Sequence, residues 1–120
     1  MKIKVPPQIT FGCHTYQVVL GGDATVLDND GVTAHPEEQI IINNTIPPSR
    51  RNTSLLHECL HVIERVWNLK APEGRYVMED IIECFGEGLG QVLFSNFGIE
   101  LDWSDIKEIK LELKEGKDGD

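Results

Sequence analysis

Basic residues are scarce in this sequence, and they are not clustered. Lysine and arginine total 11 against 20 aspartates and glutamates, which gives a formal net charge of -9. Proteins that bind nucleic acids or anionic membrane surfaces usually present a basic face instead. The only adjacent basic pair is Arg50-Arg51. We therefore expect the protein to bind neither nucleic acid nor membranes.

The sequence also lacks paired cysteines and long apolar segments. Cys13, Cys59 and Cys84 have no CxxC spacing, so they predict neither a disulfide framework nor a cysteine zinc cluster. No apolar run approaches the roughly 20 residues of a transmembrane helix, and no apolar segment typical of a secretion signal follows Met1. We therefore expect a soluble, cytoplasmic protein whose thiols are reduced.

The length and composition indicate one small globular unit. The chain has 120 residues, of which 40% are apolar, and this length is common for one domain. We assign residues 1–113 to a single domain and expect the acidic tail, residues 114–120, to be disordered.

The first half of the chain has the pattern of strands and turns. Residues 8–11, 15–20 and 39–42 are rich in β-branched or aromatic side chains, and glycine and asparagine clusters separate them. Three or four strands in a small antiparallel or mixed sheet fit this half. Residues 39–42 are the candidate edge strand that could pair with a substrate backbone, and a buried strand is the alternative.

The second half changes to the 3.6-residue period of helices. One helix is expected from about Ser49 to Leu69, and a second should include the apolar positions from Val77 to Phe97. The predicted fold is therefore α+β, a small N-terminal sheet followed by two helices. The segment from Asp102 suits either a helix or a strand.

The second predicted helix contains three glycines, Gly86, Gly88 and Gly90. Each glycine costs about 1 kcal/mol relative to alanine in a helix. We expect close packing against the first helix to offset this cost.

The most informative motif is His57-Glu58-Cys59-Leu60-His61, which has the form HExxH. On a helix, two histidines four residues apart lie one turn above the other, so both can bind one zinc ion. Glu58 then lies to the side of the metal, where its carboxylate can deprotonate a water on zinc. The motif therefore predicts a catalytic zinc site with Glu58 as the general base.

A catalytic zinc ion usually has three protein ligands, so one more ligand is required. No histidine follows His61, whereas the second predicted helix has a ridge of glutamates at Glu79, Glu83 and Glu87. We predict Glu79 as the third ligand and Glu83 as a carboxylate that orients a ligand histidine. The reverse assignment of Glu79 and Glu83 stays open, and Glu87 is expected on a solvated face.

These motifs together resemble those of the gluzincin metallopeptidases. The matching segments are Leu55-Leu56-His57-Glu58-Cys59-Leu60-His61 and the glutamate helix from Glu79 to Leu89. Within the gluzincins, the chain is similar to the ImmA/IrrE-like metallopeptidases and to small relatives encoded by phages and mobile elements. That similarity extends to Val5-Pro6-Pro7-Gln8-Ile9, to Gly12-x-His14-Thr15-Tyr16 and to Pro47-Pro48-Ser49 before the active-site helix.

The resemblance implies a minimal zincin-like fold and zinc-dependent cleavage of a peptide or protein, such as one specific regulatory protein. A second donor to the oxyanion is expected on general grounds. Tyr76, shortly before Glu79, is the leading candidate, ahead of Arg75, His35 and His14. The main alternative function is a zinc-stabilised regulatory or interaction domain with weak catalysis, and an interaction domain without metal is a third.

Overall fold

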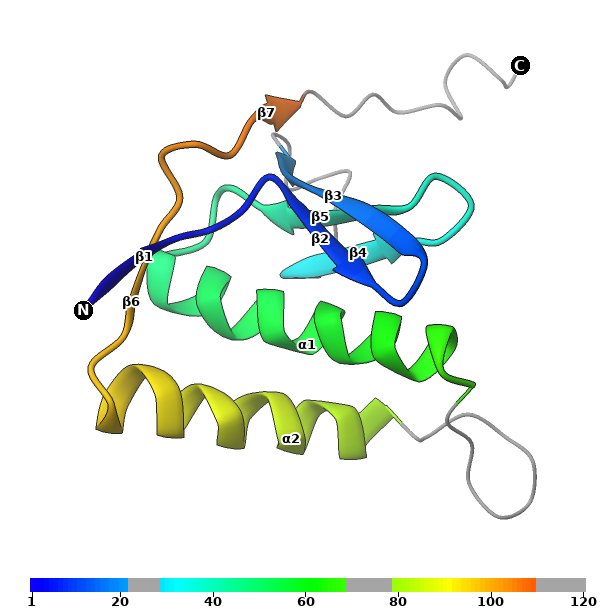
Figure 1. Ribbon diagram of the computed structural model, residues 1–120. Helices are drawn as coiled ribbons and strands as arrows, with labels where there is room; N and C mark the ends of the chain where they lie inside the picture. The colour runs from blue at the N-terminus through cyan, green and yellow to red at the C-terminus, as the bar shows by residue number, and fades with distance from the viewer. Residues whose placement is uncertain (22–28, 69–78, 110–120) are drawn as a thin grey trace.

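In the computed structural model, a mixed β-sheet packs against one helix and a second helix packs on the first, which confirms the predicted α+β class (Figure 1). The structure describes residues 1–21, 29–68 and 79–109, so the predicted tail at 114–120 lies outside the described residues. The elements are β1 (Lys2–Lys4), β2 (Gln8–Phe11), β3 (His14–Gly21), β4 (Gly31–Ala34), β5 (Gln39–Asn43), α1 (Pro48–Val66), α2 (Glu79–Gly90), the π-helix η1 (Gln91–Asn96), β6 (Glu100–Asp102) and β7 (Glu108–Ile109).

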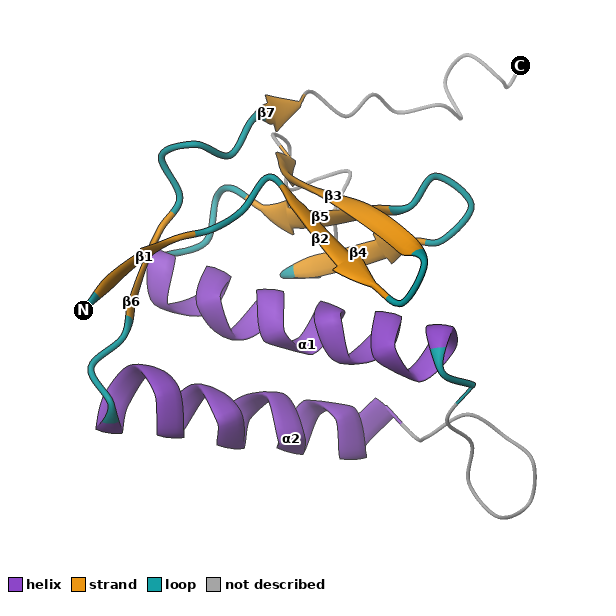
Figure 2. Ribbon diagram, in the orientation of Figure 1, coloured by secondary structure: helices purple, strands orange, loops and turns teal. Residues whose placement is uncertain are grey.

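The elements form three layers, and α1 is the middle layer. Strands β2, β3, β4 and β5 lie on one side of α1, and α2 lies on the other side, antiparallel to α1 (Figure 2). Strands β1 and β6 form a separate pair near the N-terminal end of α1 (Figure 2). A helix in this position is covered on two faces, which explains why α1 carries both core residues and site residues.

The main sheet has the strand order β2-β3-β5-β4, and β7 also pairs with β3. The central pair, β3 and β5, is parallel, whereas the β2-β3 and β4-β5 pairs are antiparallel. The prediction that residues 39–42 form an edge strand is therefore wrong, because β5 lies between β3 and β4. Ile40, Ile41 and Ile42 are all buried, and an unbroken β-branched run is typical of a strand that is covered on both faces. Among the described strands of this sheet, β4 is at the edge beside β5.

The main core lies between the sheet and α1. Val18, Ile40 and Ile42 project from the sheet onto Leu55 and Val62 of α1. A smaller cluster of Val19 and Ile41, with Ile109 packed against it, covers the opposite face of the sheet. Successive side chains of β3 point to opposite faces of the sheet, and both faces are buried, with Val18 in the main core and Val19 in the smaller cluster.

Helix α1 begins at Pro48, one residue before the predicted Ser49. Proline suits the first helical turn because the missing N–H has no partner there in any case. The helix ends at Val66, earlier than the predicted Leu69. Asn68 has a positive φ of 54°, a left-handed conformation in which asparagine often follows the end of a helix.

The second predicted helix contains two helical forms, and its first predicted position, Val77, lies outside the described residues. Helix α2 is α-helical from Glu79 to Gly90, and η1 continues as a π-helix to Asn96. Gly98, with φ of 69°, then turns the chain, as expected for a glycine after a helix.

Two of the three helix glycines face α1. A Cβ added at Gly86 would lie 3.5 Å from His57 Cα, and one at Gly90 would lie 3.4 Å from Thr53 Oγ1. A Cβ added at Gly88 would meet nothing within 4 Å. The expected close packing is therefore confirmed at Gly86 and Gly90 and is wrong for Gly88.

As far as Ile109, the segment after η1 forms strands and no helix, and the rest of the segment from residue 110 lies outside the described residues. Strand β6 pairs in parallel with β1, from Lys2↔Glu100 to Lys4↔Asp102, and β7 joins the main sheet. Trp103 and Ile106, between these two strands, are buried in the main core.

Candidate metal centre

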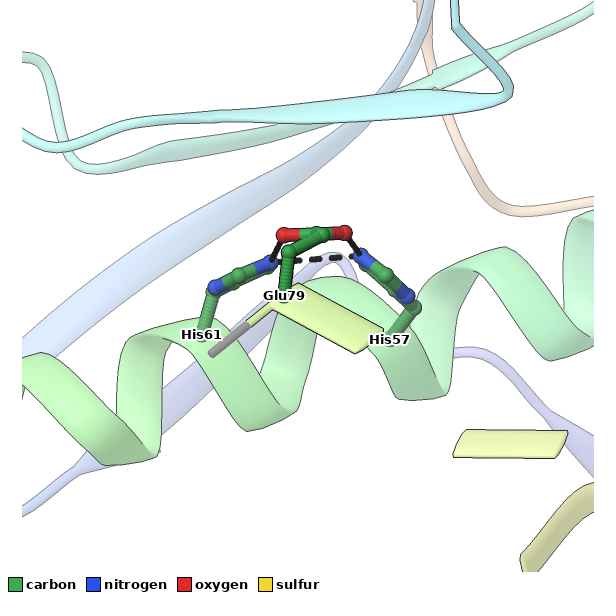
Figure 3. Close-up of side chains that lie close together, drawn as sticks. All are labelled: His57, His61 and Glu79. Carbon is green, nitrogen blue, oxygen red and sulfur yellow. Dashed lines mark hydrogen bonds and ion pairs between the residues drawn. The ribbon is translucent and has the colours of Figure 1, made fainter. Parts of the chain in front are cut away.

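His57, His61 and Glu79 converge at the contact between the two helices (Figure 3). The Nε2 atoms of His57 and His61 lie 3.2 Å apart on consecutive turns of α1. Glu79, the first residue of α2, places Oε2 2.7 Å from His57 Nε2 and Oε1 2.8 Å from His61 Nε2. The structure thus brings together the three residues predicted as ligands, His57, His61 and Glu79, which we call the metal group.

The spacing of these donors fits one small metal ion. An ion bound tetrahedrally at roughly 2.0 to 2.1 Å from each donor would hold the donors about 3.3 Å apart. The two imidazole nitrogens, 3.2 Å apart, already have this spacing. The carboxylate oxygens of Glu79 lie 2.7 and 2.8 Å from these nitrogens and would have to move away from them by about 0.5 Å. The side chains of His57 and His61 are 20% and 24% exposed, so the group is open to solvent on one side. The group can therefore bind an ion and leave one position free.

The position of Glu79 depends on the close approach of α2 to α1. Gly86 lies two turns after Glu79 and packs over the backbone of His57. A Cβ here would already be in van der Waals contact with His57, so a side chain longer than that of alanine would separate the helices and withdraw the carboxylate from the histidines.

Glu64, and not the predicted Glu83, is the carboxylate that lies against the outer ring nitrogen of one of the two histidines. Glu64 is 6% exposed, and its Oε1 lies 3.3 Å from His61 Nδ1, the ring nitrogen that faces away from the metal group. Glu83 is exposed and contacts neither histidine through a hydrogen bond or ion pair in the described part of the chain. The helical i, i+3 spacing from His61 could have indicated Glu64.

Glu58 follows His57 in α1, and a residue of the sheet holds its side chain by a hydrogen bond. It is 6% exposed, and Thr33 Oγ1 of β4 donates a hydrogen bond of 2.6 Å to its Oε1. The approach of α1 to β4 requires a glycine, because a Cβ at Gly31 would lie 2.6 Å from Ser54 Oγ and 3.2 Å from Glu58 Cγ. No pattern in the sequence pointed to Thr33 as a partner of Glu58.

A cavity of about 1220 Å³ connects these groups. Its walls are β4, α1 and α2, and it includes His57, Glu58 and His61 on one side and Glu79 and Glu83 on another. Glu87 also lines this cavity and is exposed, as predicted. The metal group, the predicted base and the sheet edge thus share one open space.

The candidates for a second oxyanion donor differ in position. Tyr76 and Arg75 lie outside the described residues. His14 is exposed and pairs with Glu38 at 2.8 Å, away from the cavity lining. His35 lines the cavity and lies 2.9 Å, through Nδ1, from the hydroxyl of Tyr16.

Cys59, in the middle of the motif, is not suited to nucleophilic chemistry. Burial, with a smaller contribution from the charge of Glu58, raises the pKa of its thiol to about 12. The thiolate is the nucleophilic form of cysteine, so this residue is unreactive at neutral pH. It packs instead against the main core.

Comparison of the chain with known protein families, with curated proteins and with solved structures finds no match. Among the described helices, none combines the length and the apolar character needed to cross a bilayer.

Proposed function

We propose that the protein is a zinc-dependent metallopeptidase of the minimal gluzincin type, as its resemblance to the ImmA/IrrE-like enzymes implies, and that it acts in the cytoplasm. The observation that supports this most is the convergence of His57, His61 and Glu79 in the same cavity as Glu58. Three donors and an adjacent carboxylate are the parts that metal-assisted hydrolysis requires.

The donor set favours zinc over other divalent ions. Magnesium and calcium prefer ligand sets made of oxygen, whereas two imidazoles and one carboxylate are typical of catalytic zinc. When bound, zinc would lower the pKa of a water molecule and polarise a peptide carbonyl.

Glu58 is the general base and then the general acid of the proposed reaction. Its carboxylate takes a proton from water as the water oxygen bonds to the scissile carbonyl carbon. Glu58 then gives this proton to the amide nitrogen as the C–N bond breaks, so that a carboxylic acid and an amine leave. The hydrogen bond from Thr33 to Oε1 fixes the carboxylate in the cavity wall.

Strand β4 takes the substrate-binding role that the sequence analysis gave to residues 39–42. Gly31, Val32 and Thr33 of β4 line the cavity, and β4 is the edge of the described main sheet beside β5. A peptide that adds to this edge as an extra strand would pass the zinc site with its backbone held and its sequence little restricted. The resemblance to the ImmA/IrrE-like enzymes points to a regulatory protein as the natural substrate.

The test combines metal analysis with hydrolysis of a mixed peptide pool by wild type, Glu58→Gln, Glu79→Gln and Glu87→Gln proteins. We expect Glu58→Gln to keep zinc and to lose activity by at least ~100-fold, within the range of general acid–base catalysis. Glu79→Gln should lose zinc, and Glu87→Gln, on the same ridge, should behave as wild type. Unchanged activity in Glu58→Gln would refute the mechanism, and full zinc occupancy in Glu79→Gln would refute its ligand role.

A zinc-stabilised interaction domain is the second candidate function. The hydrogen bond between Thr33 and Glu58 also joins β4 to α1, which gives Glu58 a structural task that needs no catalysis. This alternative predicts zinc in both the wild type and Glu58→Gln, no hydrolysis by either, and a lower melting temperature for the variant.

A further inference from the structure

His35 belongs to the cavity, although it comes from the sheet and not from either helix. It directly follows Ala34, the last residue of the edge strand β4, and lines the same cavity as His57, Glu58 and His61. It is half-buried. A substrate on β4 would therefore pass next to its ring.

The ring of His35 is held in one orientation. Its Nδ1 lies 2.9 Å from the hydroxyl of Tyr16, and the two rings meet edge to face with centroids 6.0 Å apart. Tyr16 is 3% exposed within the main core. The backbone is also fixed, because Glu38 N–H donates to the carbonyl of His35 at 3.1 Å.

The hydrogen bond with Tyr16 determines which ring nitrogen carries the proton. Burial, followed by the charge of Glu38, raises the pKa of Tyr16 against a smaller opposing effect of Arg65, so its hydroxyl stays protonated. Burial, followed by the charges of Arg65 and His61, lowers the pKa of His35 despite Glu64, so the neutral imidazole predominates at neutral pH.

Within the described residues, His35 Nδ1 is the only hydrogen-bond partner of the Tyr16 hydroxyl. When Tyr16 donates to Nδ1, the single proton of the neutral ring is on Nε2. The nitrogen that is not engaged by Tyr16 is then an N–H donor on a ring that lines the cavity.

We propose that the Nε2–H of His35 donates a hydrogen bond to the carbonyl oxygen of the scissile peptide bond and holds that oxygen as its negative charge develops, with Tyr16 as the positioning residue. This inference rests on the proposed peptidase function. His35 is outside the group of described side chains whose donor atoms all lie within 4.8 Å of one another, which separates this role from that of a metal ligand. No bond to His35 forms or breaks, because the ring donates the same hydrogen bond to the substrate carbonyl and to the oxyanion.

The first experiment needs no metal and no activity. Nitrogen-15 NMR of the imidazoles in the metal-free protein at neutral pH should show His35 as the neutral Nε2–H tautomer. Tyr16→Phe should convert His35 to a mixture of tautomers and leave the exposed His14 unchanged. A protonated ring or an Nδ1–H tautomer in the wild type would overturn the proposal.

The second experiment uses the zinc-loaded protein and two substitutions, each of which replaces only one of the two ring nitrogens of His35. In His35→Asn, the side-chain amide can reach the position of Nδ1, and so Tyr16, but it lacks a donor at the position of Nε2. In His35→Gln, the amide nitrogen reaches the position of Nε2. We expect His35→Asn to lower kcat by about 100- to 1000-fold, the usual effect of removing one oxyanion donor. His35→Gln should lose less, while KM, zinc content and melting temperature change little in both variants.

The control is His14→Asn, the same substitution at the other histidine outside the metal group, which should keep wild-type activity. Tyr16→Phe should lower kcat by less than His35→Asn, and the double variant should be no slower than His35→Asn alone, because both changes remove one donor. The affinity for a phosphinic peptide, which presents two oxygens like the tetrahedral intermediate, should fall in His35→Asn by a factor similar to that for kcat.

The outcomes separate this inference from the proposed function. Activity of His35→Asn within twofold of the wild type, with Glu58→Gln inactive, would overturn only the role of His35. Loss of zinc from His35→Asn would make His35 a ligand and would also overturn that role. If the zinc-loaded wild type hydrolyses no peptide and binds no phosphinic peptide, the proposed function fails, and the role of His35 fails with it.

Discussion

Glu64 is a buried carboxylate that contacts one of the three residues proposed to bind the metal. One of its oxygens lies 3.3 Å from His61 Nδ1, and the other is buried and has no hydrogen-bond partner among the described residues. Burying a charge that is only partly satisfied costs free energy, so the contact with His61 should provide a compensating benefit. A carboxylate on the outer ring nitrogen fixes the tautomer of a ligand histidine and raises its basicity.

We therefore predict that Glu64→Gln weakens zinc binding. The amide oxygen can still accept a hydrogen bond from His61 but carries no charge, so the loss should be about tenfold, at the lower end for such partners. Competition with a chromophoric chelator measures the affinity. Glu83→Gln is the matched control, and an equal loss in that variant would return the orienting role to Glu83.

At the residue scale, the sequence predicted the side chains that belong to local motifs. His57, Glu58 and His61 are placed by helical spacing, and Glu79 by the need for a third ligand. Thr33 was not predicted, and His35 was only one of the lower-ranked candidates for the oxyanion donor, because their contacts with Glu58 and Tyr16 join residues 25 and 19 positions apart in the chain. Contacts of this range depend on how β4 packs on α1 and pairs in the sheet, which no local pattern encodes.

At the scale of elements, the site depends on how closely α1 approaches its two neighbours. Gly31 permits the contact with β4, since an added Cβ would lie 2.6 Å from Ser54 Oγ and 3.0 Å from Ile42 Cδ1. Gly88 differs from Gly31 because it faces open space, and an added Cβ there would meet nothing within 4 Å.

Alanine substitutions at these two glycines should therefore change the free energy of unfolding in opposite directions. Gly31→Ala should lower the free energy of unfolding by about 1 to 3 kcal/mol through overpacking, whereas Gly88→Ala should raise it by up to about 1 kcal/mol through helix propensity. Urea unfolding of the metal-free proteins measures both values. A neutral Gly31→Ala would show that α1 can move away from β4 at little cost.

The positions of the helices and strands in the sequence were largely predictable, but which strands pair with one another was not. The period of 3.6 located α1 and α2, and β-branched runs located β3 and β5. The edge assignment of residues 39–42 failed because a strand sequence reports burial more directly than position in a sheet. The parallel pairing of β1 with β6 joins the two ends of the described chain, from Lys2↔Glu100 onward, and local periodicity carries no information on such pairing.

At the scale of the whole molecule, the metal group connects the last two layers of the fold. His57 and His61 belong to the middle layer and Glu79 to the outer one, so an ion would bind α2 to α1 directly. The described residues of α2 that are buried are few, namely Ile82, Gly86 and Gly90. A helix with so little buried surface should depend on the ion more than α1 does.

Zinc should therefore stabilise the whole chain. At a free zinc concentration of 100 times Kd, binding to the native state adds about 2.7 kcal/mol, which corresponds to a rise of roughly 10 °C in melting temperature for a chain of this size. Differential scanning calorimetry with zinc and with a chelator measures the shift. Glu58→Gln should show the same zinc-induced rise as the wild type because Glu58 is not a ligand, whereas Glu79→Gln should show a much smaller one. A full rise in Glu79→Gln would mean that the ion is held by α1 alone and does not join the two helices.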